Sequence, residues 1–446
     1  MVILIKNGTI INEGLSYIGS LLLVDDRISK IYKDKEELPE ADETIDASGL
    51  CIVPGIIDDQ VHFREPGSTY KGCIESESAA AVLGGVTSYM DMPNNNPPAT
   101  SIELLENKNK IAANTSYANW SFYIGASNDN IKELMRIDRT KTCGIKVFMG
   151  SSTGNMLVDN PDVLERIFAE TKSLIATHCE DETIIRANLK SAVEKYKGNI
   201  PFSEHPNIRS REACIKSSKK AIDLALKYNS RLHILHISTA EEIVMIEEAA
   251  KKNPGITGEV CVHYMLLDSS DYPEYGSLMK CNPAIKEKKD KEAIIAGVKK
   301  GIIKVVATDH APHTYQEKQT GYLEAPSGLP LIQHSFQIMW DLHKAGYFSQ
   351  YDVVDRMSHS PAENFKIRNR GYIREGYYAD ILIFNPDKVD ETTTKKPAYR
   401  CGWSPFSNKN FNSSIVHTFV NGVQVVSNGM LTNKKGGKRL EFDYGK

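Results

Sequence analysis

The sequence predicts an α/β fold, a (β/α)8 TIM-type barrel with a small β domain beside it, and two patterns carry this prediction. Over residues 52–368, short apolar segments alternate with long helical patterns, as in parallel α/β folds. At both chain ends, polar and apolar residues alternate between glycine-marked turns, as in short strands. Neither end has enough strands for a stable core alone, so the two ends must meet. We therefore expect residues 1–51 plus 369–446 to form a composite β-sandwich domain, and residues 52–368 the barrel.

The strands of the β domain are expected in order along the chain. The N-terminal ones lie in VILIKNGTIINEG (2–14), GSLLLVDDRISKIY (19–32) and ETIDASGLCIVPG (43–55). The C-terminal ones lie in GYIREGYYADILIFNP (371–386) and IVHTFVNGVQVVSNGML (415–431). Within the last segment, Asn421 and Gly422 separate two apolar runs, which predicts a hairpin turn.

The barrel units follow between these ends. Apolar strands are expected in GGVTSYMDMP (84–93), CGIKVFMG (143–150), SLIATHCE (173–180), SRLHILHIS (230–238) and IIKVVATDHAPH (302–313). Helices are expected in SIELLENKNKIAANTS (101–116), NPDVLERIFAETKS (160–173) and TAEEIVMIEEAAKK (239–252). A doubly wound open sheet is the alternative, but the sequence shows no glycine-rich phosphate loop near its first strand.

Composition excludes several classes of protein. A formal net charge of -3 over 446 residues gives no reason to expect a nucleic-acid or membrane surface. The N-terminus lacks the pattern of a signal peptide, and no apolar run approaches the roughly 18 residues that span a bilayer. The eight cysteines include no Cys-x-x-Cys pair, so we expect reduced thiols in a cytoplasmic protein.

Chemically versatile residues fall at the carboxyl ends of different predicted barrel strands, where barrel enzymes place their active sites. They are His62, Lys146, His178, His236 and Asp309. An unpaired buried lysine is costly, so Lys146 needs a carboxylate partner or a chemical role. Addition of CO2 to its amine would give a carbamate whose two oxygens can bridge two metal ions. Three imidazoles, a carboxylate and a carbamate would suit zinc.

The segment IDDQVHFREPG (57–67) raises a question about this site. In a regular strand, Asp58, Gln60, His62 and Arg64 point to the same face. Three of these four residues suit a metal or anion site. Gln60 stands where a second metal-binding histidine is expected, and a neutral amide oxygen is a poorer zinc ligand than imidazole.

With these motifs the sequence resembles the cyclic amidohydrolases, and most closely the dihydroorotases, over nearly the whole chain. The matching motifs are PGIIDDQVHFREPG, MDMPNNNP, IKVFMG, THCED, LHIST, CNPAIK and ATDHAPH, followed by EKQTGYLEAPSGLP. The resemblance implies reversible, metal-dependent cyclisation of N-carbamoyl-L-aspartate to (S)-dihydroorotate in pyrimidine biosynthesis. The resemblance also implies two possible assemblies: a homodimer, and a complex with aspartate transcarbamoylase.

The resemblance implies a role for each candidate. His62 would hold the more buried metal, a carboxylated Lys146 would bridge, and His178 and His236 would hold the second metal. Asp309 would be both a metal ligand and the catalytic proton shuttle. The metal would be Zn2+, one or two per chain. Residues that match substrate contacts are Arg64, Asn94 and His313, for the free carboxylate and ring edge, and Asn282, for the ring. The segment after His313 would close over the pocket.

The sequence departs from the family pattern at two positions. Gln60 replaces the first histidine of a His-x-His pair, and Tyr264 follows His263 where a second histidine is common. Two alternatives therefore stay open: a related cyclic amidohydrolase of the hydantoinase or allantoinase type, and an inactive dihydroorotase-like partner of aspartate transcarbamoylase. Dihydroorotate is preferred because a substrate without a carboxylate would not need Arg64 and Asn94 together.

Overall fold

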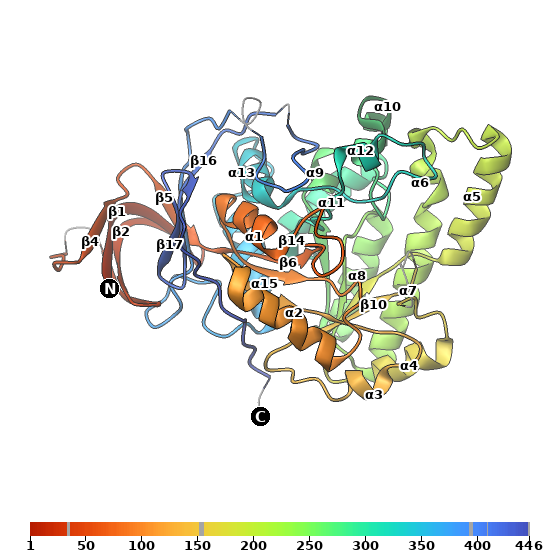
Figure 1. Cartoon of the computed structure of the whole chain (residues 1–446), viewed down its shortest axis with the longest axis horizontal. Coiled ribbons are helices and arrows are strands. Elements are labelled where there is room, and N and C mark those ends of the chain that lie inside the picture. Colours follow the sequence, from red (N-terminus) through yellow and green to blue (C-terminus); the bar gives the residue numbers. More distant parts are fainter. Residues whose placement is uncertain (34–35, 151–155, 392–395, 408, 445–446) are drawn as a thin grey trace.

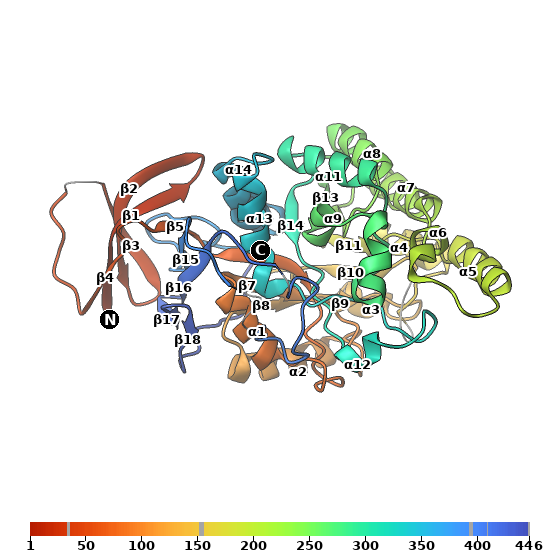
Figure 2. The ribbon, with the colours of Figure 1, turned by 90° about the horizontal axis from the view of Figure 1, so that it is seen from above.

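The computed structural model describes residues 1–33, 36–150, 156–391, 396–407 and 409–444. A β domain built from both chain ends lies beside a larger α/β barrel (Figure 1). The same arrangement is seen from above in Figure 2, where strands from the two ends of the sequence lie next to one another.

The β domain contains one nine-stranded sheet that both chain ends build. Its strands are β1 (Val2–Asn12), β2 (Leu15–Val24), β3 (Arg27–Lys33), β4 (Glu43–Asp46), β5 (Cys51–Pro54), β15 (Ile381–Asn385), β16 (Ser414–Val420), β17 (Val423–Ser427) and β18 (Met430–Leu431). Their order is β18-β17-β16-β15-β5-β1-β2-β3, and β4 also pairs with β1. The antiparallel pairing of β5 with β15 joins the two ends.

Irregular pairing bends this sheet. The register of β1 against β2 shifts between Ile5 and Gly8. Before the shift β1 pairs with β4, and after it with β5. Such bulges turn a strand, and a separate buried cluster of apolar residues fills the β domain. The predicted turn at Asn421 and Gly422 is confirmed: both residues have positive φ, 50° and 75°, and they connect β16 to β17.

The barrel strands are parallel and form a closed ring. They are β6 (Ile56–Val61), β7 (Val86–Asp91), β8 (Asn119–Phe122), β9 (Ile124–Gly125), β10 (Ile145–Phe148), β11 (Ile175–His178), β12 (Leu232–Ile234), β13 (Ile256–Cys261) and β14 (Val305–Ala307). Only Tyr123 separates β8 from β9, so within the described residues they count as one of eight barrel strands. A parallel bridge between Val61 and His310 closes the ring, which makes the open-sheet alternative wrong.

Helices follow the barrel strands and pack around them. The longer ones are α1 (Ile74–Leu83), α2 (Ile102–Thr115), α4 (Pro161–Glu170), α5 (Glu182–Tyr196), α7 (Arg211–Tyr228), α8 (Ala240–Lys252), α11 (Lys288–Lys299) and α13 (Ser335–Lys344). The shorter ones are α3 (Ile131–Leu134), α6 (His205–Ile208), α9 (His263–Leu266), α10 (Tyr272–Tyr275), α12 (Tyr315–Lys318), α14 (Gln350–Val354) and α15 (Ser360–Phe365). In the part of the chain that the structure describes, none of the helices has the length and apolar character to cross a membrane.

Local sequence explains where these helices begin. The Thr239 side chain accepts from the backbone of Glu242, whose side chain bonds back to Thr239, a capping box that starts α8. Asn160 caps α4, which has a proline in its first turn. The helices predicted at 101–116, 160–173 and 239–252 are confirmed as α2, α4 and α8.

The last described residues leave the β sheet and pack on the barrel. Leu440, Phe442 and Tyr444 belong to a buried cluster that includes Tyr123 of the barrel wall. The backbone N–H of Leu440 donates to the Trp120 carbonyl at 2.8 Å. The tail therefore fixes the β domain against the barrel; the exact domain boundaries stay a prediction.

Candidate active site

A cavity of about 90 Å3 opens at the carboxyl ends of the barrel strands. It contains every predicted metal and substrate residue except His313. Its lining is Gln60, His62, Arg64, Asn94, Lys146, Phe148, His178, His236, Asn282, Asp309, Ala311, Ser327 and Gly328. Cavities of about 650 and 490 Å3 lie elsewhere, but they hold none of the predicted residues. Chemistry, and not size, therefore marks the smaller cavity as the candidate site.

The side chains in this cavity form two close groups. His62 Nε2 lies 3.0 Å from Asp309 Oδ1. His178 Nδ1 lies 2.9 Å from His236 Nε2. Lys146, 1% exposed on β10, is the fifth member of the predicted set. The sequence thus identified residues that the fold brings together from five barrel strands.

Two histidines of the cavity each have one ring nitrogen hydrogen-bonded to a neighbouring side chain, as metal-binding histidines usually do. His62 Nδ1 lies 2.7 Å from Asn94 Oδ1, and His178 Nε2 lies 2.8 Å from Glu180 Oε2. Such contacts fix the ring and leave the other nitrogen facing the site. The buried Nδ1 of His236 and Oε1 of Gln60 have no hydrogen-bond partner among the described residues. Imidazole nitrogens and a carboxylate that converge in this way fit a divalent metal.

Burial sets the charge states of these groups. Burial lowers the pKa of His178 and takes that of His236 well below its ordinary value, which favours the neutral imidazoles that bind metals. Burial likewise lowers the pKa of Lys146 to about 8, although Asp309 and Glu259 oppose this. For Asp309, burial alone would raise the pKa, but the hydrogen bond and charge of His62 outweigh it and hold it at about 2.

Gln60 occupies the expected position but is hydrogen-bonded to another site residue. Its Nε2 donates to Asp309 Oδ1 at 3.0 Å. The amide therefore orients Asp309, and its Oε1 is the atom that remains for a ligand. In this arrangement Gln60 can support the metal group, but as a weak donor.

Asp58 does not line the cavity, in contrast to the expectation that it shares this face with Gln60, His62 and Arg64. Its Oδ2 accepts from Thr308 Oγ1 at 2.6 Å. The reason is a register shift of β6 against β7 between Asp58 and Val61, which breaks regular alternation. Burial raises the pKa of Asp58 to about 8.

The anion-binding candidates lie together at one side of the cavity. Arg64, in a left-handed conformation with φ of 67°, donates from Nε to the Pro312 carbonyl at 3.0 Å. Its Nη2 lies 3.0 Å from His313 Nε2, which places His313 behind Arg64. Lys71 Nζ lies 3.0 Å from His313 Nδ1. Ammonium and guanidinium groups only donate, so each ring nitrogen of His313 faces a donor and these two contacts do not select one tautomer.

Two supporting contacts were missed at the sequence level. Glu180 bonds both His178 and Arg209, and the charge of Arg209 together with these hydrogen bonds, against its burial, takes its pKa far below the ordinary value. Phe148 lines the cavity two residues after Lys146 and lies 4.6 Å, centroid to ammonium, from it. The alternation of side chains along IKVFMG could have identified Phe148.

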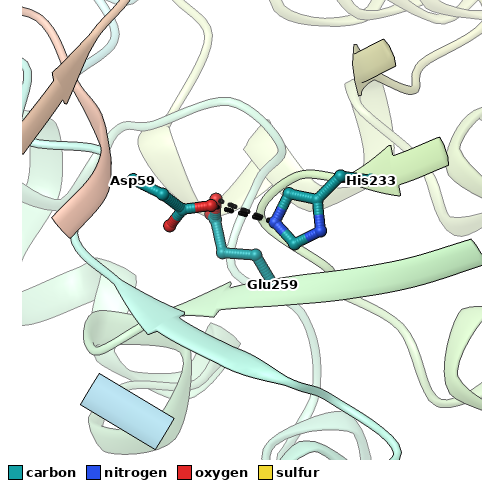
Figure 3. A group of neighbouring side chains, drawn as sticks. All are labelled: Asp59, His233 and Glu259. Atoms are coloured by element: carbon teal, nitrogen blue, oxygen red, sulfur yellow. Dashed lines mark hydrogen bonds and ion pairs between the residues drawn. The ribbon is translucent and has the colours of Figure 1, made fainter. Parts of the chain in front are cut away.

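A second group of potential ligands was also missed, and it lies outside the cavity. Asp59, His233 and Glu259 bring one ligand atom each within 4.8 Å of the others, and all three are buried (Figure 3). His233 Nε2 lies 2.9 Å from Asp59 Oδ2 and 3.9 Å from Glu259 Oε2. These residues lie on β6, β12 and β13, and β6 and β12 also lead to the candidate residues His62 and His236.

Comparisons with known proteins agree with this geometry. The sequence pattern of the amidohydrolase family matches residues 51–425. A dihydroorotase of Clostridioides difficile is 31% identical over 94% of this chain and 98% of its own. A dihydroorotase of Pyrococcus abyssi is 30% identical over 98% of both chains.

Solved structures agree on the fold. The L-hydantoinase (dihydropyrimidinase) of Arthrobacter aurescens superposes with a TM-score of 0.94, at 24% identity, over 99% of this chain and 100% of the other. The dihydropyrimidinase of Brevibacillus agri gives 0.90 at 24% identity, over 100% of both chains. The chain therefore belongs to the amidohydrolase family, and its sequence relatives named here are dihydroorotases.

Proposed function

We propose that this protein is a dihydroorotase, a hydrolase of cyclic amides that interconverts N-carbamoyl-L-aspartate and (S)-dihydroorotate. The observation that carries the proposal is one cavity that combines a metal-type group of His62, Lys146, His178, His236 and Asp309 with Arg64. The sequence relatives over most of the chain support the same activity. The place of this reaction would be pyrimidine biosynthesis.

The residues that would hold the metal are those five, with Gln60 as a weak additional donor. We propose Zn2+, one or two ions per chain, and a carboxylated Lys146 would offer carbamate oxygens as ligands. A bound divalent ion supplies an acidified water and a polarised carbonyl. The lowered pKa of Lys146 accords with carboxylation, since the neutral amine is the form that adds CO2.

The chain's own groups then move the proton and orient the substrate. Asp309 accepts a proton at a carboxylate oxygen and returns it to the ring nitrogen that leaves. The planar fork of Arg64 binds the free carboxylate of the substrate. Since Asn94 Oδ1 is used by His62, its amide N–H group is what remains to donate to that carboxylate. Asn282 and His313 complete the contacts to the ring and its edge.

A hydantoinase-type activity is the second candidate, because the fold matches hydantoinases closely. Hydantoins carry no carboxylate on the ring, so they would leave Arg64 without an anionic partner. The third candidate, an inactive partner of aspartate transcarbamoylase, has only the replacements at Gln60 and Tyr264 in its favour. It is disfavoured because the other five candidate groups converge in the cavity.

The decisive experiment uses purified, zinc-loaded protein. Ring opening of dihydroorotate, closure of N-carbamoyl-L-aspartate and ring opening of hydantoin and dihydrouracil are compared, with metal per chain measured in the same samples. We expect turnover of the first pair and little of the others. Protein that opens hydantoin but not dihydroorotate would replace the proposal with the second candidate, and metal-loaded protein inactive on all four would support the third.

We further propose a cytoplasmic enzyme that acts as a homodimer. All eight cysteines are free, six of them buried, as in proteins of reducing compartments. The dimer, and an association with aspartate transcarbamoylase, are tested by the mass of the protein in solution alone and with that partner.

A further inference from the structure

We propose that Lys318 and Lys280 are positioning residues: their ammonium groups together hold residues 322–328, which form one wall of the catalytic cavity. Ser327 and Gly328 of this segment line the cavity. That this wall orients the substrate rests on the proposed function. The hydrogen bonds of Lys318 and Lys280 that hold residues 322–328, here called the clamp, do not depend on which substrate is bound.

Lys318 is at the centre of the clamp. Its side chain is fully buried, at the end of α12. Its Nζ donates to three carbonyl oxygens, those of Lys280 at 3.0 Å, Pro326 at 2.9 Å and Gly328 at 3.1 Å. An ammonium has three N–H donors, so this set uses all of them. The charge is thereby solvated by backbone carbonyls that belong to two different segments.

Lys280 connects the same two segments from the other side. Its Nζ, also buried, donates to the carbonyls of Tyr322 and Ala325, both at 2.6 Å. Its own carbonyl accepts from the backbone N–H of Gly328 at 3.0 Å as well as from Lys318. Asn282, two residues further along the chain, lines the cavity. The two lysines thus fix the distance between two walls of the site.

The segment has little freedom at its cavity end. Gly328 has φ of 142°, and a Cβ there would lie 2.6 Å from the Ala311 carbonyl oxygen. The Ser327 carbonyl lies 3.1 Å from His313 Nε2. Movement of residues 322–328 would therefore disturb both the wall and the ring of His313, a substrate-binding candidate.

Burial of two lysines is unfavourable for stability, which suggests a role in positioning. Burial lowers the pKa of Lys318 to about 7 and that of Lys280 to about 8. Met is unbranched and of similar length, so it fills most of the space of the Lys318 side chain, although three carbonyls lose the ammonium as a donor. We therefore expect Lys318→Met to fold while losing the charge-assisted bonds that fix the carbonyl directions.

Kinetics of the metal-loaded enzyme test the role. In Lys318→Met we expect KM for dihydroorotate to rise about ten- to a hundredfold, as small displacements of positioning groups do, with metal content unchanged. The kcat value should change by less than about threefold, because the reacting groups stay in place. The matched control is Lys286→Met, which removes a buried lysine of the neighbouring CNPAIK segment (281–286) whose Nζ donates to the Ala284 carbonyl. Equal KM values for Lys318→Met and the wild type would overturn the proposal.

A double-mutant cycle with Lys318→Met, Lys280→Met and the double variant gives a sharper test. Lys280→Met also tests the proposal by itself if Lys318→Met does not fold. Lys280→Met should raise KM in the same way, and the double variant should be much less affected than the product of the two single effects. Such non-additivity is expected for two groups that hold one segment. Fully multiplicative effects would show that the lysines act separately.

Hydrogen exchange of the metal-loaded protein separates the clamp from the proposed function. In Lys318→Met, amides of 322–328 should exchange faster than in the wild type, whereas those of β10 and β11 should not change. Unchanged exchange in 322–328 overturns the clamp even if dihydroorotate is the substrate. Faster exchange in a protein that does not turn over dihydroorotate would sustain the clamp and reject the proposed function.

Discussion

Two clusters of the same residue types lie in this barrel, and only one has the form of a reaction site. The cavity cluster of His62, His178, His236 and Asp309 faces an open space at the strand ends. The triad of Asp59, His233 and Glu259 lies outside that cavity and is fully buried, each residue at 0% exposure. A catalytic metal needs an open position for its substrate, and so residue type alone does not define a reaction site.

The two clusters also differ in how their charge is balanced. Around Asp309, imidazoles hold the carboxylate in its charged form. In the triad, burial, reinforced by the charge of Asp59, raises the pKa of Glu259 well above its ordinary value. A protonated Glu259 would remove one of two buried charges without any metal. Yet the clusters touch: Glu259 Oε1 accepts from the His236 backbone N–H at 3.1 Å, so the triad supports the site from below.

The largest expected effect comes from the cavity cluster. Lys146→Ala should lose metal and lower activity by more than about a hundredfold, since even indirect supports of metal ligands are worth that much. Short carboxylic acids should restore part of both, because they can replace the carbamate. Metal content and ring opening are measured together. Full zinc occupancy in the alanine variant would remove Lys146 from the metal group.

A smaller effect should distinguish substrate binding from metal binding within the cavity. Arg64→Met removes a charge-assisted contact worth about 1.5–3 kcal/mol, so kcat/KM for dihydroorotate should fall at least tenfold. Metal content should stay unchanged, because Arg64 bonds to Pro312 and His313 and to none of the five metal candidates. If kcat/KM is the same as in the wild type, Arg64 lies outside the substrate site.

Gln60 is the poorest zinc donor among the predicted ligands of the cavity cluster. We expect two unequal zinc-binding steps in the wild type, with mild chelation removing the ion near His62 first. Gln60→His should tighten the weaker step by about 10–100-fold, since imidazole is the better donor. Zinc titration of both metal-free proteins, with activity followed in parallel, measures this. Two equally tight ions in the wild type would show that Gln60 does not weaken zinc binding.

The triad should respond only in stability. Asp59→Asn leaves buried partners imperfectly satisfied, which costs about 1–3 kcal/mol of unfolding free energy. Bound metal per chain should equal that of the wild type. The comparison rests on elemental analysis and thermal unfolding of both proteins. Loss of one metal ion per chain in the variant would make the triad a metal site and would break the contrast between the two clusters.

The sequence by itself determined the barrel, because strand and helix periodicities are local and the polar residues follow apolar runs. It also predicted that His62, Lys146, His178, His236 and Asp309 lie near one another, as they do in the cavity, since residues toward the carboxyl ends of parallel strands lie at the same face. Their roles stay a prediction. Helices such as α8 could be placed from their helical pattern, and the capping box at Thr239 sets where α8 begins.

Tertiary structure decided what local patterns do not contain. The register shift between Asp58 and Val61 turned Asp58 toward Thr308 and away from the cavity, and it arises from pairing with a neighbouring strand. Whether a buried carboxylate such as Glu259 belongs to a metal site or supports one depends on which strands surround it. The carbonyls that solvate Lys318 lie in two segments brought together by the fold. Contacts of this kind depend on distances across the barrel, and periodicity within one strand does not carry that information.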